Sequence, residues 1–220
     1  MKLLSVLQSR VVAFLEADEL FTRHHMLGPE VTPNIVERYG FLKSPDHLED
    51  FLDEQKGIQF AFGRWKGTVI KQLAFYTHGI AVETAASTDI SDEILSDVLG
   101  WRAHTLNLKY HPDMVKRKAY VSGLLFSTDV SLNALHPKLR GVGERLSDSV
   151  KNSLGHVFPY EVTGIFFGYD TANTKPNAPV FTIERRADVP FSENKYFSTA
   201  PMPTNEHLEL LKDFEAALAG

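Results

Sequence analysis

The sequence predicts an α+β fold, with about six to seven strands in one mostly antiparallel sheet and helices packed against it. Three observations support this prediction. Strand-like segments occur in groups, no linker rich in glycine, serine or proline divides the chain, and each group of strands is followed by a segment with helical periodicity. We therefore expect the 220 residues to form a single domain with the order ααα-βββα-βα-βββα. A mixed sheet is the alternative.

The first 56 residues are expected to form helices, as an appendage on this domain. Apolar residues from Leu3 to Leu15 recur at helical spacing, although the β-branched pair Val11-Val12 also fits a strand. Thr32-Pro33 and Ser44-Pro45 each combine a capping hydroxyl with a proline, which is typical of a helix start.

The next segment predicts three antiparallel strands and a helix. Alternating apolar residues mark strands over residues 58–62, 67–75 and 80–84, with Phe62 expected on the same side as Phe60. Because the connections are too short for a parallel crossover, the strands form a meander. A helix with the apolar stripe Ile94–Ala103 then follows the capping residue Thr88.

The second half repeats the grouping of strands and helices. A strand over residues 120–126 precedes a helix over 135–150, in which Gly141 and Gly143 indicate close approach of a neighbouring backbone. Three more strands are predicted at residues 160–168, 180–186 and 195–198, and a last helix starts at Thr204. Residues 170–179 between two of these strands are typical of a solvated loop.

The composition of the chain excludes several kinds of protein chemistry. The chain has no cysteine, which excludes disulfides, thiolate metal sites and cysteine nucleophiles. Its N-terminus resembles a signal peptide only briefly, because Gln8, Ser9 and Arg10 interrupt the apolar run, and no stretch is long enough to span a membrane. We expect a cytoplasmic protein without membrane association.

Histidine is the residue type that most invites a metal site. Nine histidines are present, but no HExxH or HxH pattern brings two of them into ligand spacing. We therefore predict no metal and no cofactor. The nine are His24, His25, His47, His78, His104, His111, His136, His156 and His207.

Catalytic and nucleotide-binding motifs are also missing from the sequence. There is no GxSxG or SxxK pattern, and Ser122-Gly123 lies within a predicted strand. The glycine pair in Arg140–Glu144 lacks the spacing of a phosphate-binding loop and lies inside a predicted helix. We predict no catalytic residues.

Basic residues offer a candidate nucleic-acid patch, although the net charge is −5 and the pI near 6.0. Glu144 and Asp148 interleave with the basic residues of the predicted helix, which favours a solvated face with ion pairs. Nucleic-acid binding is therefore the less favoured interpretation. The patch would consist of Lys116, Arg117, Lys118, Lys138, Arg140, Arg145 and Lys151.

The C-terminal third offers a candidate protein interface. Alternation places Thr182, Glu184 and Arg186 on one face of a strand, and aromatic residues are dense nearby. The candidate interface residues are Phe191, Tyr196, Phe197, Glu184 and Arg186.

The leading hypothesis is a non-enzymatic protein-interaction or assembly subunit that self-associates as a homo-oligomer. It is favoured because a well-patterned core leaves polar strand faces and aromatic loops but no reactive centre. One alternative is a hydrolase that depends on histidine and carboxylate groups. A second alternative is a nucleic-acid-associated protein that uses the basic patch.

Overall fold

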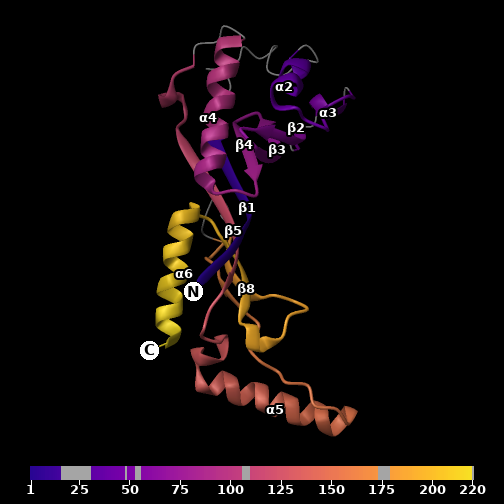
Figure 1. Ribbon diagram of the computed structural model, residues 1–220, viewed down its shortest axis with the longest axis vertical. Coiled ribbons are helices and arrows are strands. Elements are labelled where there is room, and N and C mark those ends of the chain that lie inside the picture. The colour runs from indigo at the N-terminus through magenta and orange to yellow at the C-terminus, as the bar shows by residue number, and fades with distance from the viewer. Residues whose placement is uncertain (16–30, 48, 53–55, 106–109, 173–178, 220) are drawn as a thin grey trace. The chain divides into compact units, whose positions relative to one another are not determined.

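The structure is a computed structural model that describes residues 1–15, 31–47, 49–52, 56–105, 110–172 and 179–219 (Figure 1). It confirms the α+β class: eight strands form one antiparallel sheet, in the order β2-β3-β4-β1-β5-β8-β7-β6. The strands are β1 (Lys2–Phe14), β2 (Ile58–Trp65), β3 (Thr68–Tyr76), β4 (Gly79–Thr84), β5 (Arg117–Ser127), β6 (Gly164–Phe167), β7 (Phe181–Arg185) and β8 (Lys195–Ala200).

Five α-helices accompany the sheet in the described part of the chain, together with three short 3₁₀ turns. None of these helices is both long and apolar enough to cross a membrane. The helices are α2 (Thr32–Tyr39), α3 (Glu49–Leu52), α4 (Thr88–Thr105), α5 (Pro137–Leu154) and α6 (Thr204–Ala219), and the turns are η1 (Pro112–Met114), η2 (Leu132–Leu135) and η3 (Phe191–Glu193).

The expectation of a helix over the first 15 residues is wrong, because this segment is β1. β1 pairs with β4, in a register that joins Val11 to Val82. Ser9, Val11 and Ala13 are buried at every second position, which is the period of a strand. The apolar residues of this segment also fit the period of a helix. Pairing with β4 is what makes the segment a strand.

The chain forms two compact units. Unit 1 contains residues 1–5, 123–200 and 205–220, and unit 2 contains residues 6–122 and 201–204. Whether they count as one domain stays a prediction.

Unit 2 holds a hydrophobic core between the β2-β3-β4 meander and its helices. The meander follows the predicted order, with Phe60 opposite Leu73 and Leu73 opposite Val82. Ile94 and Leu95 of α4 are fully buried in this core, as the predicted stripe required. Ile35 of α2 belongs to the same cluster.

Phe62 does not lie on the predicted face of β2. Its φ of 60° turns the chain locally, so the side chain is exposed while the next residue, Gly63, is buried. A Cβ on Gly63 would stand 2.5 Å from the ring of Phe41, so the ring of Phe41 fills the space that a side chain would need.

Hydroxyl groups hold the helix starts in unit 2. The backbone N–H of Thr88 donates to Oγ1 of Thr204 at 2.9 Å, and the N–H of Thr204 donates to Oγ1 of Thr88 at 2.8 Å. Each threonine therefore caps the helix that the other begins, which satisfies backbone donors that a helix leaves free.

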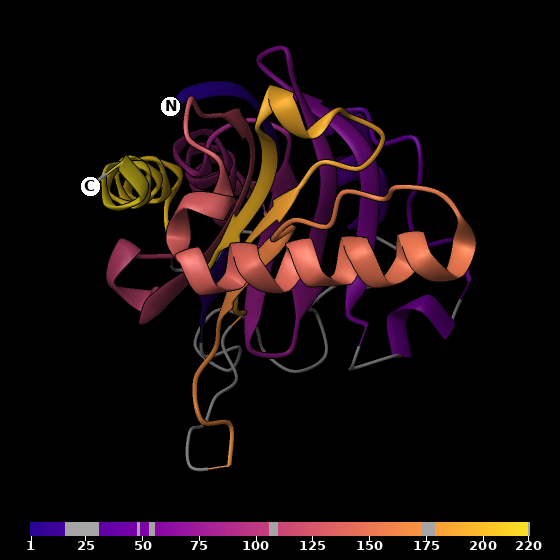
Figure 2. The ribbon, with the colours of Figure 1, turned by 90° about the horizontal axis from the view of Figure 1, so that it is seen from below.

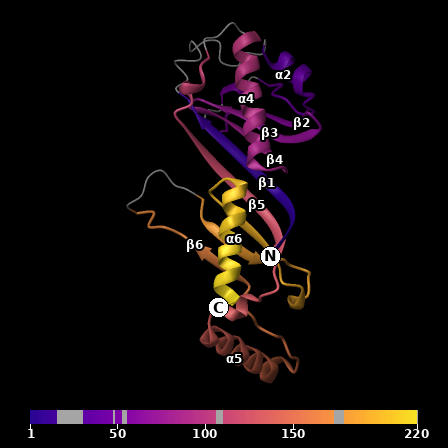
Figure 3. The same cartoon turned by 60° about the vertical axis from the view of Figure 1, so that its left-hand side comes forward.

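Unit 1 contains β6, β7 and β8 with α5 and α6. Phe181, Ile183 and Arg185 share one face of β7, and the ring of Phe181 meets that of His207 from α6. Figures 1 and 3 show α6 beside the strands of this unit. Glu184 and Arg186 are exposed, as the predicted polar face requires. Figure 2 shows α5 along its length, after the η2 turn.

Candidate functional site

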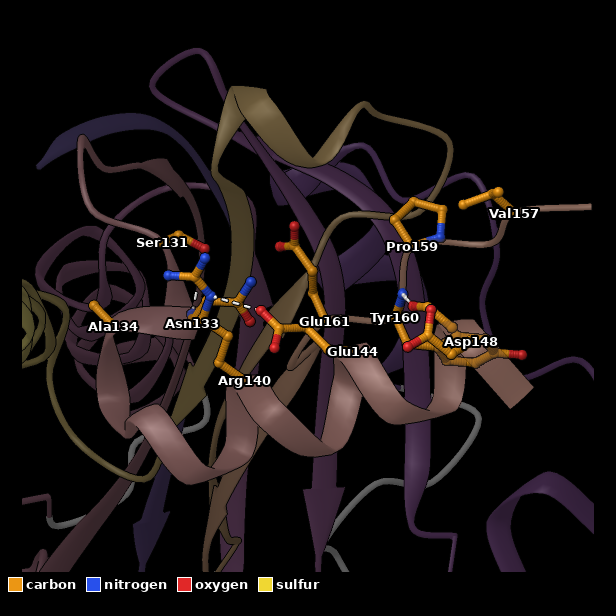
Figure 4. Close-up of a pocket in the computed structure, with 11 residues that line it drawn as sticks. Ser131, Asn133, Ala134, Arg140, Glu144, Asp148, Val157, Pro159, Tyr160 and Glu161 are labelled. Atoms are coloured by element: carbon orange, nitrogen blue, oxygen red, sulfur yellow. Dashed lines mark hydrogen bonds and ion pairs between the residues drawn. The ribbon is translucent and has the colours of Figure 1, made fainter. Parts of the chain in front are cut away.

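Unit 1 has a cavity of about 860 Å³ beside α5 (Figure 4). It lies between α5, the η2 turn and the segment 157–161. Three carboxylates line it, from Glu144, Asp148 and Glu161, together with the guanidinium of Arg140.

Close backbone contact joins α5 to the segment that forms the far wall of the cavity. A Cβ on Gly143 would stand 2.4 Å from the carbonyl oxygen of Tyr160, so only glycine permits this approach. Ser147 Oγ accepts a hydrogen bond from the Tyr160 N–H at 3.0 Å. Gly143 therefore has the predicted packing role, whereas a Cβ on Gly141 would meet only open space.

Most polar groups of the cavity form hydrogen bonds with neighbouring protein groups. Asn133 Oδ1 accepts from the N–H of Val162 at 3.2 Å, and Arg140 Nε donates to Glu144 at 3.2 Å. Glu161 accepts from Arg185 at 3.0 Å. Two of the three carboxylates are thus paired with arginines. Among the described residues that line the cavity, no histidine accompanies the serines Ser131 and Ser147.

Arg185 anchors the wall beside the cavity. Its side chain is only 3% exposed, donates to the carbonyl of Phe191 at 2.7 Å, and lies over the Phe191 ring at 4.3 Å. Charge, hydrogen bonds and stacking are the combination that arginine provides better than lysine. This residue has a positioning role in unit 1, which the sequence analysis did not assign.

The histidines that the structure describes do not gather at one place. Within the described residues, no three histidine, cysteine, aspartate or glutamate side chains are placed to hold a metal ion. His24 and His25 lie outside the described residues. Six others are exposed, and these are His47, His78, His104, His111, His136 and His156.

His207 and Ser198 form a buried pair in unit 1. The Ser198 oxygen lies 2.8 Å from Nε2 of His207, and Ser198 also donates to the carbonyl of Thr182 at 2.8 Å. Both residues are essentially inaccessible to solvent. Because a substrate carbonyl must reach a serine nucleophile, this pair as it lies has a packing role.

The basic residues of the candidate nucleic-acid patch fall into two groups. In unit 2, Lys118 is paired with Asp92 at 2.6 Å and Arg117 lies over the Phe14 ring at 4.3 Å, while Lys116 is exposed. In unit 1, Lys138, Arg140, Arg145 and Lys151 are all exposed on α5. Each group provides few phosphate contacts by itself, so the patch stays a prediction.

The candidate interface residues differ in accessibility. Phe197, Glu184 and Arg186 are exposed, whereas Phe191 is half-buried beneath Arg185. Tyr196 is completely buried, and its hydroxyl accepts from the N–H of Leu132 at 3.3 Å. Tyr196 lies in β8, where a strand was predicted, and in this conformation it packs inside unit 1.

Unit 2 has an acidic hollow of about 490 Å³ near the start of α4. Asp97 accepts hydrogen bonds there from the Tyr39 hydroxyl at 2.7 Å and from Arg38 at 2.8 Å. Burial acts to raise the pKa of the Asp97 carboxyl, but these two hydrogen bonds outweigh it and the pKa is lowered overall. Burial and the neighbouring carboxylate raise the pKa of Tyr39. Asp97, Tyr39 and Arg38 are thus joined to one another by hydrogen bonds.

A broad exposed apolar surface is the feature that the sequence analysis missed. Apolar residues recur at helical spacing as a stripe in and just before α5, at Leu135, Leu139, Val142, Leu146 and Val150. Of these, Leu139, Val142 and Leu146 of α5 are exposed, and so is Leu154 at the end of the helix. Periodicity predicts an apolar helix face but does not state what covers it. The only sign of this exposure in the sequence was that charged residues border the stripe.

Comparisons with known proteins do not assign a family to this chain. No model of a known protein family matches it, and no curated protein is significantly similar to it.

Proposed function

We propose that this protein is a non-enzymatic assembly subunit of the cytoplasm that self-associates through the surface of unit 1. The hydrolase and nucleic-acid alternatives stay predictions. The proposal is favoured by where the exposed apolar side chains lie, and by the absence of a serine–histidine pair among the described residues that line the cavity beside α5.

The observation that carries the proposal is an imbalance between the two units. Among the described residues, fourteen of the eighteen large apolar side chains that are exposed belong to unit 1, although unit 2 is the longer. Apolar surface concentrated in this way is typical of protein contact surfaces. The fourteen are Leu3, Leu4, Leu135, Leu139, Val142, Leu146, Leu154, Val157, Phe158, Tyr160, Phe166, Phe167, Val180 and Phe197.

Charge favours a second copy as the occupant of this surface. The helix α5 carries four basic and two acidic side chains, whereas the whole chain has a net charge of −5. Lys138 and Arg145 are seven residues apart, so they border the same side of the apolar stripe. Carboxylates of a second copy can pair with these basic side chains, which favours association.

The mass of the wild-type protein in solution tests this proposal. Light scattering after size exclusion, with sedimentation equilibrium over a hundredfold range of concentration, is expected to show a dimer or a larger assembly. A monomer throughout this range would contradict the proposal.

A charged substitution on α5 tests whether the apolar stripe takes part. Leu146→Glu removes an apolar contact worth about 1.5–3 kcal/mol when buried, so we expect at least tenfold weaker association. Leu42→Glu is the matched control, because Leu42 is 82% exposed and belongs to unit 2. Equal effects of the two substitutions would count against α5.

A further inference from the structure

The outer edge of β6 presents unpaired backbone groups. β6 ends the sheet, and it pairs with β7 alone in the described residues, with Ile165 opposite Ile183. The N–H of Arg185 donates to the carbonyl of Thr163 at 2.7 Å. In an antiparallel ladder, hydrogen-bonded pairs recur at every second residue, so Ile165 and Phe167 also direct their backbone groups toward β7.

It follows that Gly164 and Phe166 direct their N–H and C=O groups away from β7. No backbone hydrogen bond to these outward groups is recorded from any described residue. Four backbone donors and acceptors therefore lie along this edge, and such an edge is a template for another strand. The side chain of Phe166 beside them is 64% exposed.

The opposite edge of the same sheet is protected. Lys43 bridges to Ala61 of β2 through two backbone hydrogen bonds, of 2.9 and 3.1 Å. The next residue, Phe62, has a positive φ that breaks the regular strand, and Arg64 and Lys66 add charge. Covered groups, irregular backbone and charge are three of the devices that prevent edge pairing. None of these three is seen along β6, although its four residues make it a short edge strand.

The sequence around β6 permits pairing with itself. Residues 162–169 contain no charged side chain and no proline. The nearest acidic residues are Glu161 and Asp170, one at each end. An antiparallel copy aligned on Ile165 places Glu161 opposite Tyr169, and Asp170 opposite Tyr160, so like charges do not meet.

We propose that β6 pairs antiparallel with β6 of a second copy, across a two-fold axis at Ile165. This inference rests on the proposed self-association and specifies its central contact. An isologous contact of this kind closes a dimer, because the same edge serves both copies.

In this register, Gly164 of one copy lies opposite Phe166 of the other, and the four outward groups of each copy are satisfied. The two Phe166 rings become diagonal neighbours on the exposed face, where aromatic side chains are within reach of each other. Ile165 faces Ile165 of the second copy at a position without backbone hydrogen bonds, where the Cα atoms approach to about 4.5 Å.

Cysteine cross-linking tests the register directly, because the chain has no cysteine of its own. Ile165→Cys is expected to give a disulfide-linked dimer on mild oxidation, since that Cα separation falls in the range for disulfides. Leu42→Cys, an exposed site in unit 2, is the control and is expected to remain largely monomeric on a non-reducing gel. Equal cross-linking of both variants, or none at Ile165→Cys, would overturn the proposed register.

A charged substitution at the edge of β6 tests the pairing of the two β6 strands without a disulfide. Phe166→Lys places two cations near the two-fold axis and is expected to weaken dimerisation at least tenfold by sedimentation, whereas Leu42→Lys leaves it unchanged. Circular dichroism checks that the exposed substitution preserves the fold. A wild-type assembly that survives Phe166→Lys would refute β6 pairing but not self-association, whereas a monomeric wild type would refute both.

Discussion

In both units, hydrogen bonds from charged side chains connect segments that are distant in the sequence. Arg185 joins β7 to Glu161 and to the carbonyl of Phe191, and its guanidinium contacts the rings of Phe191 and Tyr196. A buried charge that loses its partners is costly. The stability of unit 1 should therefore depend on the shape of this side chain as well as on its charge.

Replacing Arg185 by lysine tests this dependence. Lysine keeps the charge but loses the planar fork and the stacking, so we expect the free energy of unfolding to fall by about 1–3 kcal/mol. Urea unfolding followed by circular dichroism measures the change. The control is Arg186→Lys at the exposed neighbouring position, and equal losses from both substitutions would contradict a specific role for Arg185.

Asp97 gives unit 2 a pH-dependent contribution to stability. Its pKa is lowered in the folded state, because hydrogen bonds from Tyr39 and Arg38 outweigh the effect of burial. A lowered carboxyl pKa stabilises the fold above the unfolded-state pKa of about 3.9, and the contribution disappears as pH falls through the folded-state value.

Asp97→Asn is therefore expected to lower the free energy of unfolding by about 1–3 kcal/mol near neutral pH. The difference from wild type should stay constant between about pH 5 and 8 and shrink below about pH 4. Thermal or urea unfolding at several pH values measures it. Asp46→Asn serves as the control, since that side chain is 75% exposed, and a difference that grows toward low pH would contradict the assignment.

At the scale of single elements, the two glycines of α5 have opposite roles. Both weaken a helix relative to alanine by about 1 kcal/mol. The backbone of Tyr160 occupies the space beside Gly143, whereas the space beside Gly141 is open. The sequence shows two equivalent helix-weakening residues, and only the neighbouring backbone distinguishes them.

The substitutions Gly141→Ala and Gly143→Ala are expected to have opposite signs. Gly141→Ala should stabilise the protein by up to about 1 kcal/mol, because alanine favours the helix. Gly143→Ala should destabilise it, because the new Cβ displaces the segment 157–161 from the helix. Urea unfolding of the two variants gives both signs, and stabilisation by both would contradict the packing of this segment on α5.

Helices with local start signals were predicted well from the sequence. Thr88 and Thr204 begin α4 and α6 as expected, although each hydroxyl accepts a hydrogen bond from the backbone N–H of the other threonine. Ser44-Pro45 did not start a helix at that point, and α3 begins only at Glu49. The burial of each helix face depends on its neighbours. The apolar face of α4 is buried in the core, whereas apolar side chains of α5 are exposed.

At the scale of the whole molecule, β1 has a central place in the sheet. It lies between β4 and β5 in the strand order, and Val11 is completely buried in the core of unit 2. A helical appendage would tolerate polar substitutions along this segment, whereas an interior strand tolerates them only on its exposed side.

Two aspartate substitutions within β1 distinguish these arrangements. Val11→Asp buries an unpaired carboxyl and is expected to abolish folding or to lower stability by more than about 4 kcal/mol. Leu3→Asp, at an exposed position of the same strand, is expected to change stability by less than about 0.5 kcal/mol. Soluble yield and circular dichroism measure both, and tolerance of Val11→Asp would contradict the central position of β1.

The sequence alone determined the fold class, the meander of β2, β3 and β4, and the starts of α4 and α6. The meander depends on residues close in the chain, whereas the threonines that start the two helices cap each other across 116 residues. The sequence could not place β1, whose apolar residues from Leu3 to Leu15 fit two periods. It also could not show that the stripe of α5 and the edge of β6 are exposed. Only the tertiary structure decided these points, because burial is a property of what packs on a segment, and that partner is distant in the sequence or belongs to another molecule.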